Sequence, residues 1–162
     1  MDEVYLVEKV GAYFTVTDVT RSQWASDHNV DNSIPEELLK NAERVATQVI
    51  DRIISELDIN VLINSWYRNA TVNAGVGGSQ NPLSAHCDGR AVDLYITNKD
   101  IHAAFDAIKA SDIQFDKMII ERNKRGSQWI HVQVRKDGSP ARRITLQADY
   151  NHESGKMEYK PA

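Results

Sequence analysis

The chain has 162 residues, of which 41% are hydrophobic and 26% charged, a composition typical of a folded globular domain rather than a disordered or fibrous protein. Its formal net charge of −4 gives no electrostatic reason to expect a nucleic-acid partner, and no apolar run is long enough for membrane insertion. No repeat or Pro/Gly-rich linker divides the chain. We therefore predict a single monomeric domain, with residues 1–32 as an N-terminal arm and a tail from about residue 150 to 162.

The N-terminal segment lacks a basic stretch followed by an apolar run, so we expect synthesis in the cytoplasm without a signal peptide. Within the arm, residues 13–16 are expected to form a short strand or a tucked-in segment. The clearest helix is predicted over Ile34–Leu57, because its apolar residues recur at helical spacing over a wide face. Ser33 and Glu36 match a capping box at its start. This helix is expected to pack against a sheet and to carry no chemistry.

The middle of the chain predicts alternating strands and helices around a long polar loop. A short buried strand is expected over Asn60–Asn64, followed by a loop over Ser65–Gly89 whose length is typical of functional segments. A second strand is expected over Arg90–Ile96, with Asp93 on one face and its apolar neighbours on the other. A second helix follows over Lys99–Ala110, with Asn98 as its N-cap.

Three strands are predicted at the end of the fold, over Phe115–Glu121, Gln128–Arg135 and Arg142–Ala148. A hairpin loop with Gly126 in the left-handed conformation would set Glu121 opposite Trp129 and Ile119 opposite His131. Glu121 and His131 would then share a face, about 7–8 Å apart at the backbone. Asp137-Gly138 predicts a tight turn between the last two strands. The predicted fold class is α+β, with helices packed on one side of a mainly antiparallel sheet.

Two histidines and one aspartate form a candidate metal site. His86 and Asp93 lie seven residues apart around Gly89, and His131 follows on a distant strand. Two imidazoles and a carboxylate are the protein ligands of many catalytic zinc sites, which leave the fourth position open for water. Such a set also accepts other divalent ions. A histidine that directly precedes Cys87 suggests a thiolate ligand too, but adjacent side chains of an extended chain point apart, so we interpret Cys87 as a buried small hydrophobe.

A family resemblance connects these residues. The runs Ser65-Trp66-Tyr67-Arg68-Asn69, Val72-Asn73-Ala74-Gly75-Val76-Gly77-Gly78-Ser79, Ser84-x-His86-x-x-Gly89-x-Ala91-x-Asp93 and Trp129-Ile130-His131-Val132 occur in this order. They resemble the zinc D-Ala-D-Ala carboxypeptidase family, which includes phage L-alanyl-D-glutamate endolysins and shares its core with the hedgehog signalling domain. The resemblance extends over roughly Tyr13 to Val134.

The resemblance implies that His86, Asp93 and His131 bind Zn2+. It also implies that Arg68 holds a substrate carboxylate or backbone carbonyl, with a loop-bracing salt bridge as the alternative. Ser84 is expected to contact substrate or orient a ligand, or else to serve only as a turn residue. Trp129 is expected to line the substrate groove, although it also suits simple packing.

Two departures from the family pattern affect the expected chemistry. The segment that precedes His86, from Asn81, is two residues longer than in many members and should reshape the loop there. Where other branches place a glutamate three residues before the last ligand, this chain has Gln128, which cannot accept a proton. Glu121 is the nearest carboxylate on the predicted face and is our candidate for the general base.

The implied function is that of a zinc peptidase cutting peptidoglycan peptides, either at D-Ala-D-Ala termini or at the L-Ala-D-Glu bond. We expect action at the bacterial cell wall by a phage or prophage lysin or a virion-associated hydrolase. One alternative is a non-catalytic, zinc-stabilised wall-binding or phage structural domain. Another is a cytoplasmic D-Ala-D-Ala dipeptidase.

Overall fold

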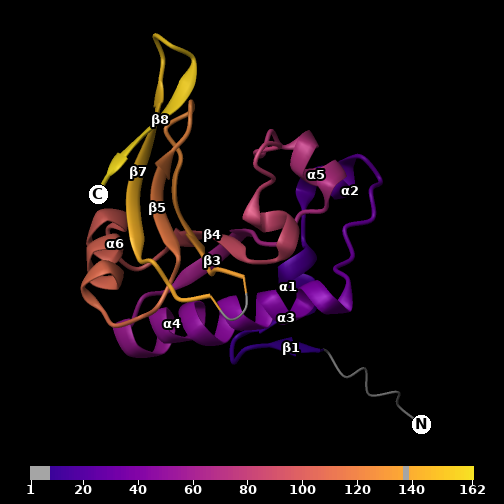
Figure 1. Ribbon diagram of the computed structural model, residues 1–162, viewed down its shortest axis with the longest axis horizontal. Coiled ribbons are helices and arrows are strands. Elements are labelled where there is room, and N and C mark those ends of the chain that lie inside the picture. The colour runs from indigo at the N-terminus through magenta and orange to yellow at the C-terminus, as the bar shows by residue number, and fades with distance from the viewer. Residues whose placement is uncertain (1–7, 137–138) are drawn as a thin grey trace.

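A computed structural model describes residues 8–136 and 139–162 and shows the longest helices packed against one face of a six-stranded sheet (Figure 1). All neighbouring strands are antiparallel except β5 and β7, which run parallel. The predicted α+β class is therefore confirmed. In spatial order the strands are β3 (Val61–Ser65), β4 (Ala91–Ile96), β6 (Gln128–Gln133), β5 (Lys117–Arg122), β7 (Ile144–Asn151) and β8 (Lys156–Pro161).

The helical elements are mostly short, apart from one long continuous rod. That rod consists of α3 (Glu36–Val45), a π-helical turn η1 (Ala46–Ile50) and α4 (Asp51–Leu57). The remaining elements are β1 (Lys9–Val10), β2 (Phe14–Thr15), α1 (Val16–Thr20), α2 (Gln23–Asp27), α5 (Ala70–Gly75), the 3-10 helix η2 (Ala85–Asp88) and α6 (Ile101–Ala110). No helix in the described part of the chain is long and apolar enough to cross a membrane.

The two faces of the sheet have different chemistry because side chains alternate along each strand. The face under the rod and α6 is apolar at its centre: Leu94, Met118 and Ile130 there have no exposed surface. The opposite face carries the polar residues, among them Asp93, Glu121 and His131. Cross-strand pairing aligns Asp93 with His131 and His131 with Ile119 in one row across the sheet.

The long helix begins differently from the prediction. Its N-cap is Pro35, and no side chain caps it. Ser33, expected to form a capping box with Glu36, instead donates its backbone N–H and its hydroxyl to the Asp31 carboxylate. The competing acid two residues earlier in the chain captures the serine, so the predicted capping box is wrong.

Further local corrections concern the loop, the second helix and the C-terminus. The loop expected over Ser65–Gly89 contains two short helices, α5 and η2. The N-cap of α6 is Asp100 rather than Asn98, whose amide binds the backbone at Asn60 and Asp58. The predicted tail over residues 150–162 is also wrong, because residues 150–151 end β7 and Lys156–Pro161 form its hairpin partner β8.

Strand β7 follows β6 in the chain but lies on the other side of β5 in the sheet. Strand β7 pairs with β5 and not with β6, so the last two predicted strands do not form the hairpin that a tight turn between them would give. The predicted turn at Asp137-Gly138 lies outside the described residues. In contrast, the hairpin between β5 and β6 has the predicted register, with Glu121 opposite Trp129 and Ile119 opposite His131, and Gly126 has a φ of +85°.

Candidate metal centre and its cleft

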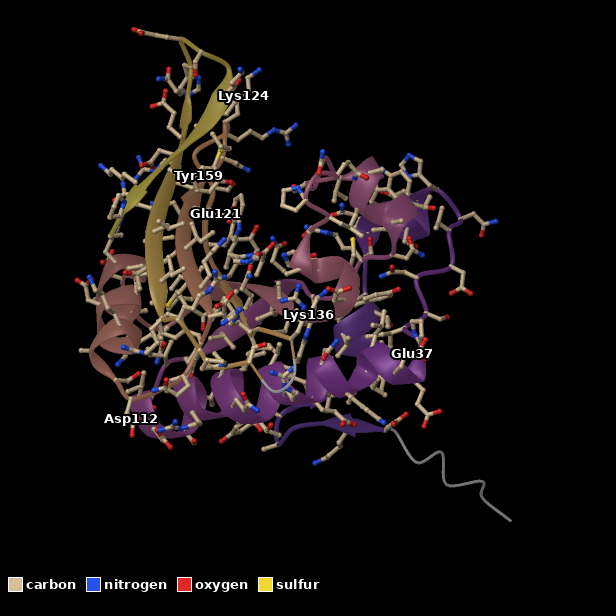
Figure 2. The ribbon with its side chains drawn as sticks, viewed as in Figure 1. Glu37, Asp112, Glu121, Lys124, Lys136 and Tyr159 are labelled. Carbon is tan, nitrogen blue, oxygen red and sulfur yellow. The ribbon has the colours of Figure 1, made fainter. Side chains whose placement is uncertain are left out.

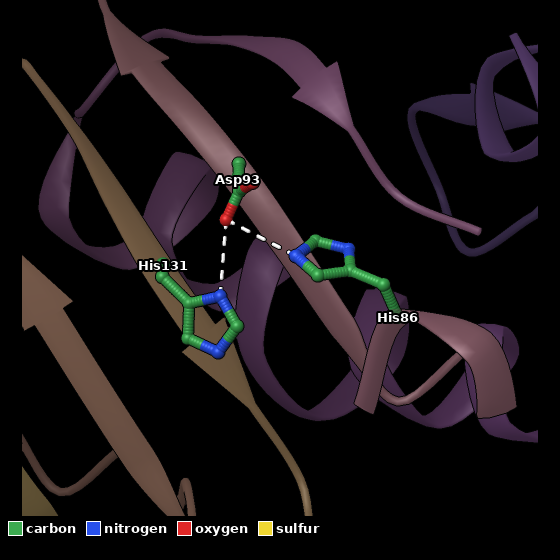
Figure 3. A group of neighbouring side chains, drawn as sticks. All are labelled: His86, Asp93 and His131. Atoms are coloured by element: carbon green, nitrogen blue, oxygen red, sulfur yellow. Dashed lines mark hydrogen bonds and ion pairs between the residues drawn. The ribbon is translucent and has the colours of Figure 1, made fainter. Parts of the chain in front are cut away.

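Three predicted ligands meet on the polar face of the sheet. His86 comes from η2, Asp93 from β4 and His131 from β6, and one ligand atom of each lies within 4.8 Å of the others (Figure 3). The Asp93 Oδ1 atom is 3.3 Å from His86 Nε2 and 3.0 Å from His131 Nδ1. All three side chains are buried.

Two hydrogen bonds fix the orientation of His86, one made by its ring and one by its backbone N–H. Its Nδ1 lies 2.6 Å from the carbonyl oxygen of Trp66, which must therefore accept an Nδ1 proton. Its Nε2 is left with the lone pair and faces Asp93. Ser84 caps η2 by accepting a hydrogen bond from the backbone N–H of His86 at 3.2 Å. The structure thus gives Ser84 a positioning contact with a ligand.

Gln133 fixes the second imidazole. Its Oε1 lies 2.8 Å from His131 Nε2, and its amide nitrogen is 3.5 Å from Asp116 Oδ2. A carboxylate only accepts hydrogen bonds, so the NH2 group must face Asp116 and the carbonyl oxygen must face the histidine. His131 therefore carries its proton on Nε2, and Nδ1 is the atom that can bind a metal.

The ionisation of the three groups follows from burial and mutual contact. Burial lowers the pKa of His86, which keeps the ring neutral as a metal ligand must be. For Asp93, burial acts to raise the pKa, but the two histidines outweigh it and hold the pKa well below its usual value. Burial acts to lower the pKa of His131, yet Asp93 raises it, because its carboxylate can accept a hydrogen bond from Nδ1 when the ring takes up a second proton. A carboxylate anion at this position is ready to bind a cation.

Two of the separations between the predicted ligand atoms match those of a zinc site. Four ligands at zinc–nitrogen and zinc–oxygen distances of about 2.0–2.1 Å in a tetrahedron stand about 3.3 Å apart. The observed separations of 3.3 and 3.0 Å between Asp93 and the two imidazoles are close to this value. Each imidazole also has its other nitrogen bound to an acceptor, as metal-binding histidines almost always do.

Arg68 lies beside the ligands but is largely engaged by the protein. Its Nη1 is 4.0 Å from Asp93 Oδ2 and 3.3 Å from Ser65 Oγ, and its Nε donates to Asn73 Oδ1. Burial lowers its pKa. These contacts match the loop-bracing alternative, while its position on the cleft wall keeps substrate binding as a prediction.

Glu121 and Trp129 stand next to the ligands on the same face. Burial, followed by the charge of Asp93, raises the pKa of Glu121 to about 7. His131, Arg68 and the Trp129 indole act in the opposite direction. The indole N–H approaches this carboxylate without reaching hydrogen-bond geometry, since Nε1 is buried and has no partner among the described residues. Glu121 is therefore a poorly solvated carboxyl that takes up a proton near neutral pH.

The site opens into a cleft of about 640 Å³ between the sheet and the segment over residues 76–86. Arg68, Ser84, Trp129 and the three predicted ligands all line it. The α5 side of the cleft contains Gly78, where an added Cβ would lie 1.9 Å from Asn73 Oδ1. The buried Asn73 amide holds this wall by donating to the Ser79 carbonyl.

Sequence reasoning missed two residues of this site. Gln133 could have been found from its position two residues after His131, which places both side chains on one face of the strand. Tyr159 had no such signal, because it lies on β8, which was expected to be a tail. Pairing aligns Trp129, Glu121, Ala148 and Tyr159 in one row, so the phenol faces the cleft across a small alanine. Cys87 is buried and unpaired, and it is outside the metal-binding group, as expected.

A family model described as Peptidase M15 matches residues 12–133. This range contains the three ligands, Arg68 and Glu121. No curated protein matches the chain.

Proposed function

This chain belongs to the peptidase M15 family, whose members are zinc-dependent metallopeptidases, and from this premise we propose that its substrates are the stem peptides of peptidoglycan. The bond cut is either the D-Ala-D-Ala bond or the L-Ala-D-Glu bond. The resemblance of the four sequence motifs to enzymes with these two specificities supports the proposal.

The observation that carries the catalytic part of the proposal is the position of Glu121. It lies on the same sheet face as His131, diagonally across the β5–β6 pair, and it lines the same cleft. Zinc held by His86, Asp93 and His131 would polarise the scissile carbonyl and acidify a water molecule. Glu121 takes the proton from the attacking water and returns it to the leaving nitrogen. A pKa of about 7 suits a group that must do both.

We also propose that the protein is a phage or prophage lysin, or a virion-associated wall hydrolase, acting at the bacterial cell wall. The support is the likeness of the N-terminal arm and the long helix to the phage and prophage branch of the family. Zymography of sacculi and immunogold labelling of particles distinguish a free lysin from a virion component.

One observation favours a second candidate, a non-catalytic wall-binding or phage structural domain stabilised by zinc. Gln128 stands three residues before His131, where other branches have a glutamate. If Glu121 does not serve as the base, the site binds metal and turns over poorly.

Mass spectrometry of muropeptides after incubation with the zinc-loaded protein tests the proposal. We expect cleaved stem peptides with wild type and none with Glu121→Gln, with zinc content equal in both proteins. The mass that the muropeptide loses on cleavage identifies which peptide bond is cut. Intact muropeptides with wild type, over a range of pH and salt, would contradict the peptidase assignment. Release of free D-alanine from the dipeptide without action on sacculi would instead indicate a dipeptidase.

A further inference from the structure

The cleft is electrically polarised along its length. At one end, beyond the ligands, its lining includes Lys117, Arg135, Lys136 and Arg142, and the carboxylate among them is Asp116. This local excess of positive charge contrasts with the net charge of −4 of the whole chain. At the other end the cleft has Glu121 and Tyr159. Figure 2 shows Glu121 and Tyr159 together on the sheet, and Lys136 away from both, toward the long helix.

Asp116 neutralises only part of the cationic end. Two hydrogen bonds of 2.7 and 2.9 Å join it to Arg142, and Arg135 Nε lies 3.8 Å away. The side-chain ammonium groups of Lys117 and Lys136 have no hydrogen-bond or ion-pair partner among the described residues. Lys117 is half-buried and lines the cleft, so its stem packs against the protein where the cleft begins.

Strand β5 sets the distance between the two ends. Lys117, Ile119 and Glu121 point to the same face, opposite Gln133, His131 and Trp129 respectively. Lys117 and Glu121 thus flank the metal ligand His131, about 13 Å apart along the strand at about 3.3 Å per residue. Along β5, Lys117 is two residues from Ile119, which lies in the same row as the metal ligands Asp93 and His131. This separation equals the length of one to two residues of an extended peptide.

We propose that Lys117, with Lys136 and Arg135 beside it, forms a subsite for a substrate carboxylate on the carbon that bears the scissile nitrogen. This inference rests on the proposed function, and it explains what the two candidate bonds share. In D-Ala-D-Ala the terminal carboxylate has this position. In L-Ala-D-Glu joined through the side chain of glutamate, the free α-carboxylate has it.

The proposed subsite gives Arg68 and the lysines different roles in substrate binding. Arg68 is already hydrogen-bonded to Ser65 and Asn73 and lies 4.0 Å from Asp93, one of the predicted metal ligands. Arg68 can therefore bind the scissile carbonyl, whereas the unpartnered lysines can bind the substrate carboxylate. A lysine suits this task because its ammonium has three donors and a flexible stem that follows either substrate.

Binding of uncleavable ligands to the zinc-loaded protein tests the subsite without turnover. The ligands are two reduced-bond analogues, in which CH2–NH replaces the scissile amide, one ending in D-alanine and one carrying γ-linked D-glutamate. Each is made as the free α-acid and as the α-amide, and calorimetry gives the four dissociation constants. We expect the acids to bind wild type about tenfold more tightly than the amides, with the difference shrinking as salt rises.

Two variants and a matched control complete the experiment. Lys117→Gln should remove most of the acid preference, and Lys117→Arg should retain it. Lys40→Gln, which removes an equal charge from an exposed helix position outside the cleft, should behave as wild type. The analogue pair with the larger preference for the acid over the amide identifies which substrate carboxylate the subsite binds.

The outcomes for the subsite and for the proposed function are separable. Equal binding of acid and amide, or an acid preference unchanged in Lys117→Gln, overturns the subsite even if stem peptides are cleaved. An acid preference that depends on Lys117, in a protein that leaves muropeptides intact, supports the subsite and contradicts the peptidase assignment.

Discussion

At the scale of single residues, the His131 ring depends on one amide for the choice of its metal-binding nitrogen. The Gln133 carbonyl oxygen accepts a hydrogen bond from His131 Nε2–H, and Asp116 holds the Gln133 amide in the orientation that makes this possible. Without that acceptor the proton can move to Nδ1 and compete with the metal, because either tautomer of an isolated imidazole is accessible.

We therefore expect Gln133→Leu to weaken zinc binding by about 10- to 100-fold, the usual range for loss of a hydrogen-bond partner of a ligating histidine. Competition with a chelating indicator measures the affinity. Gln48→Leu, an equal change at an exposed position of the long helix, is the control. Equal zinc affinity of Gln133→Leu and wild type would contradict the role assigned to this amide.

Glu121 makes the zinc-free protein less stable at high pH. Its pKa is raised from 4.5 to about 7, so the folded state holds a proton there that the unfolded state releases. Its contribution to stability is greatest below pH 4.5 and is lost as the pH rises through about 7. Above that pH a poorly solvated anion remains.

In the presence of a chelator, Glu121→Gln should therefore be more stable than wild type at pH 8, on the order of 1–2 kcal/mol. The gain should shrink as the pH falls toward 5. Urea denaturation at both pH values measures it. A loss of stability at pH 8 would show that the carboxylate is well solvated in the folded state.

At the scale of elements, the parallel junction between β5 and β7 is held from one end by Asp116 and Arg142. Both residues stand just before their strands, and the carboxylate is almost fully buried. The hydrogen bond from Arg142 is the main cause of the lowered pKa of Asp116. Its stabilising effect is present above the unfolded pKa of about 3.9 and is lost as the pH falls through the lower folded value.

Asp116→Asn should lower the free energy of unfolding by about 1–3 kcal/mol at pH 7, the cost of losing a charged hydrogen-bond partner. The difference from wild type should narrow as the pH falls below 4. Asp112→Asn removes an exposed ion pair with Arg52 and should cost under about 1 kcal/mol. Equal destabilisation by the two variants at pH 7 would contradict the assignment of the junction to Asp116.

Elements with strong local patterns were predictable from the sequence. The β5–β6 register followed from Gly126 and a short loop, and it gave the shared face of Glu121 and His131. Strand β8 was missed because its residues are mostly exposed and polar, so it lacks the apolar alternation of a half-buried strand. The pairing of β7 with β5 depends on contacts between distant segments, which no local pattern contains.

The site was predictable to the same extent. The resemblance of four motifs to a known family predicted the three ligands, and the structure brings these side chains together. The cationic end of the cleft was not apparent, since Lys117 and Arg135 are ordinary strand-end residues until the sheet brings them together. The Asp116 contact that orients Gln133 likewise joins residues seventeen positions apart.

At the scale of the whole molecule, the hairpin of β7 and β8 lies beyond the matched range, and Met157 and Tyr159 of β8 line one wall of the cleft. The three ligands lie on η2, β4 and β6, none of which touches β8 in the sheet order. Metal binding and this cleft wall therefore depend on different parts of the fold.

Deletion of residues 152–162 should leave zinc stoichiometry at one per chain while lowering the melting temperature by several degrees, since an eight-residue strand loses its partner. Tyr159→Ala, which keeps the strand, should retain the melting temperature. Zinc measured by atomic absorption and unfolding followed by circular dichroism give the two readouts. Loss of zinc from the shortened chain would show that the hairpin is part of the metal site.

The outermost strand also bears on how the protein behaves when crowded. Outward positions of β8 carry Lys156, Glu158 and Lys160, and Pro161 lacks the N–H that an added strand would use. Such an edge resists strand-by-strand polymerisation with neighbouring copies. Fibrils that grow through the β8 edge should therefore not form in a concentrated stock, as thioflavin fluorescence would show.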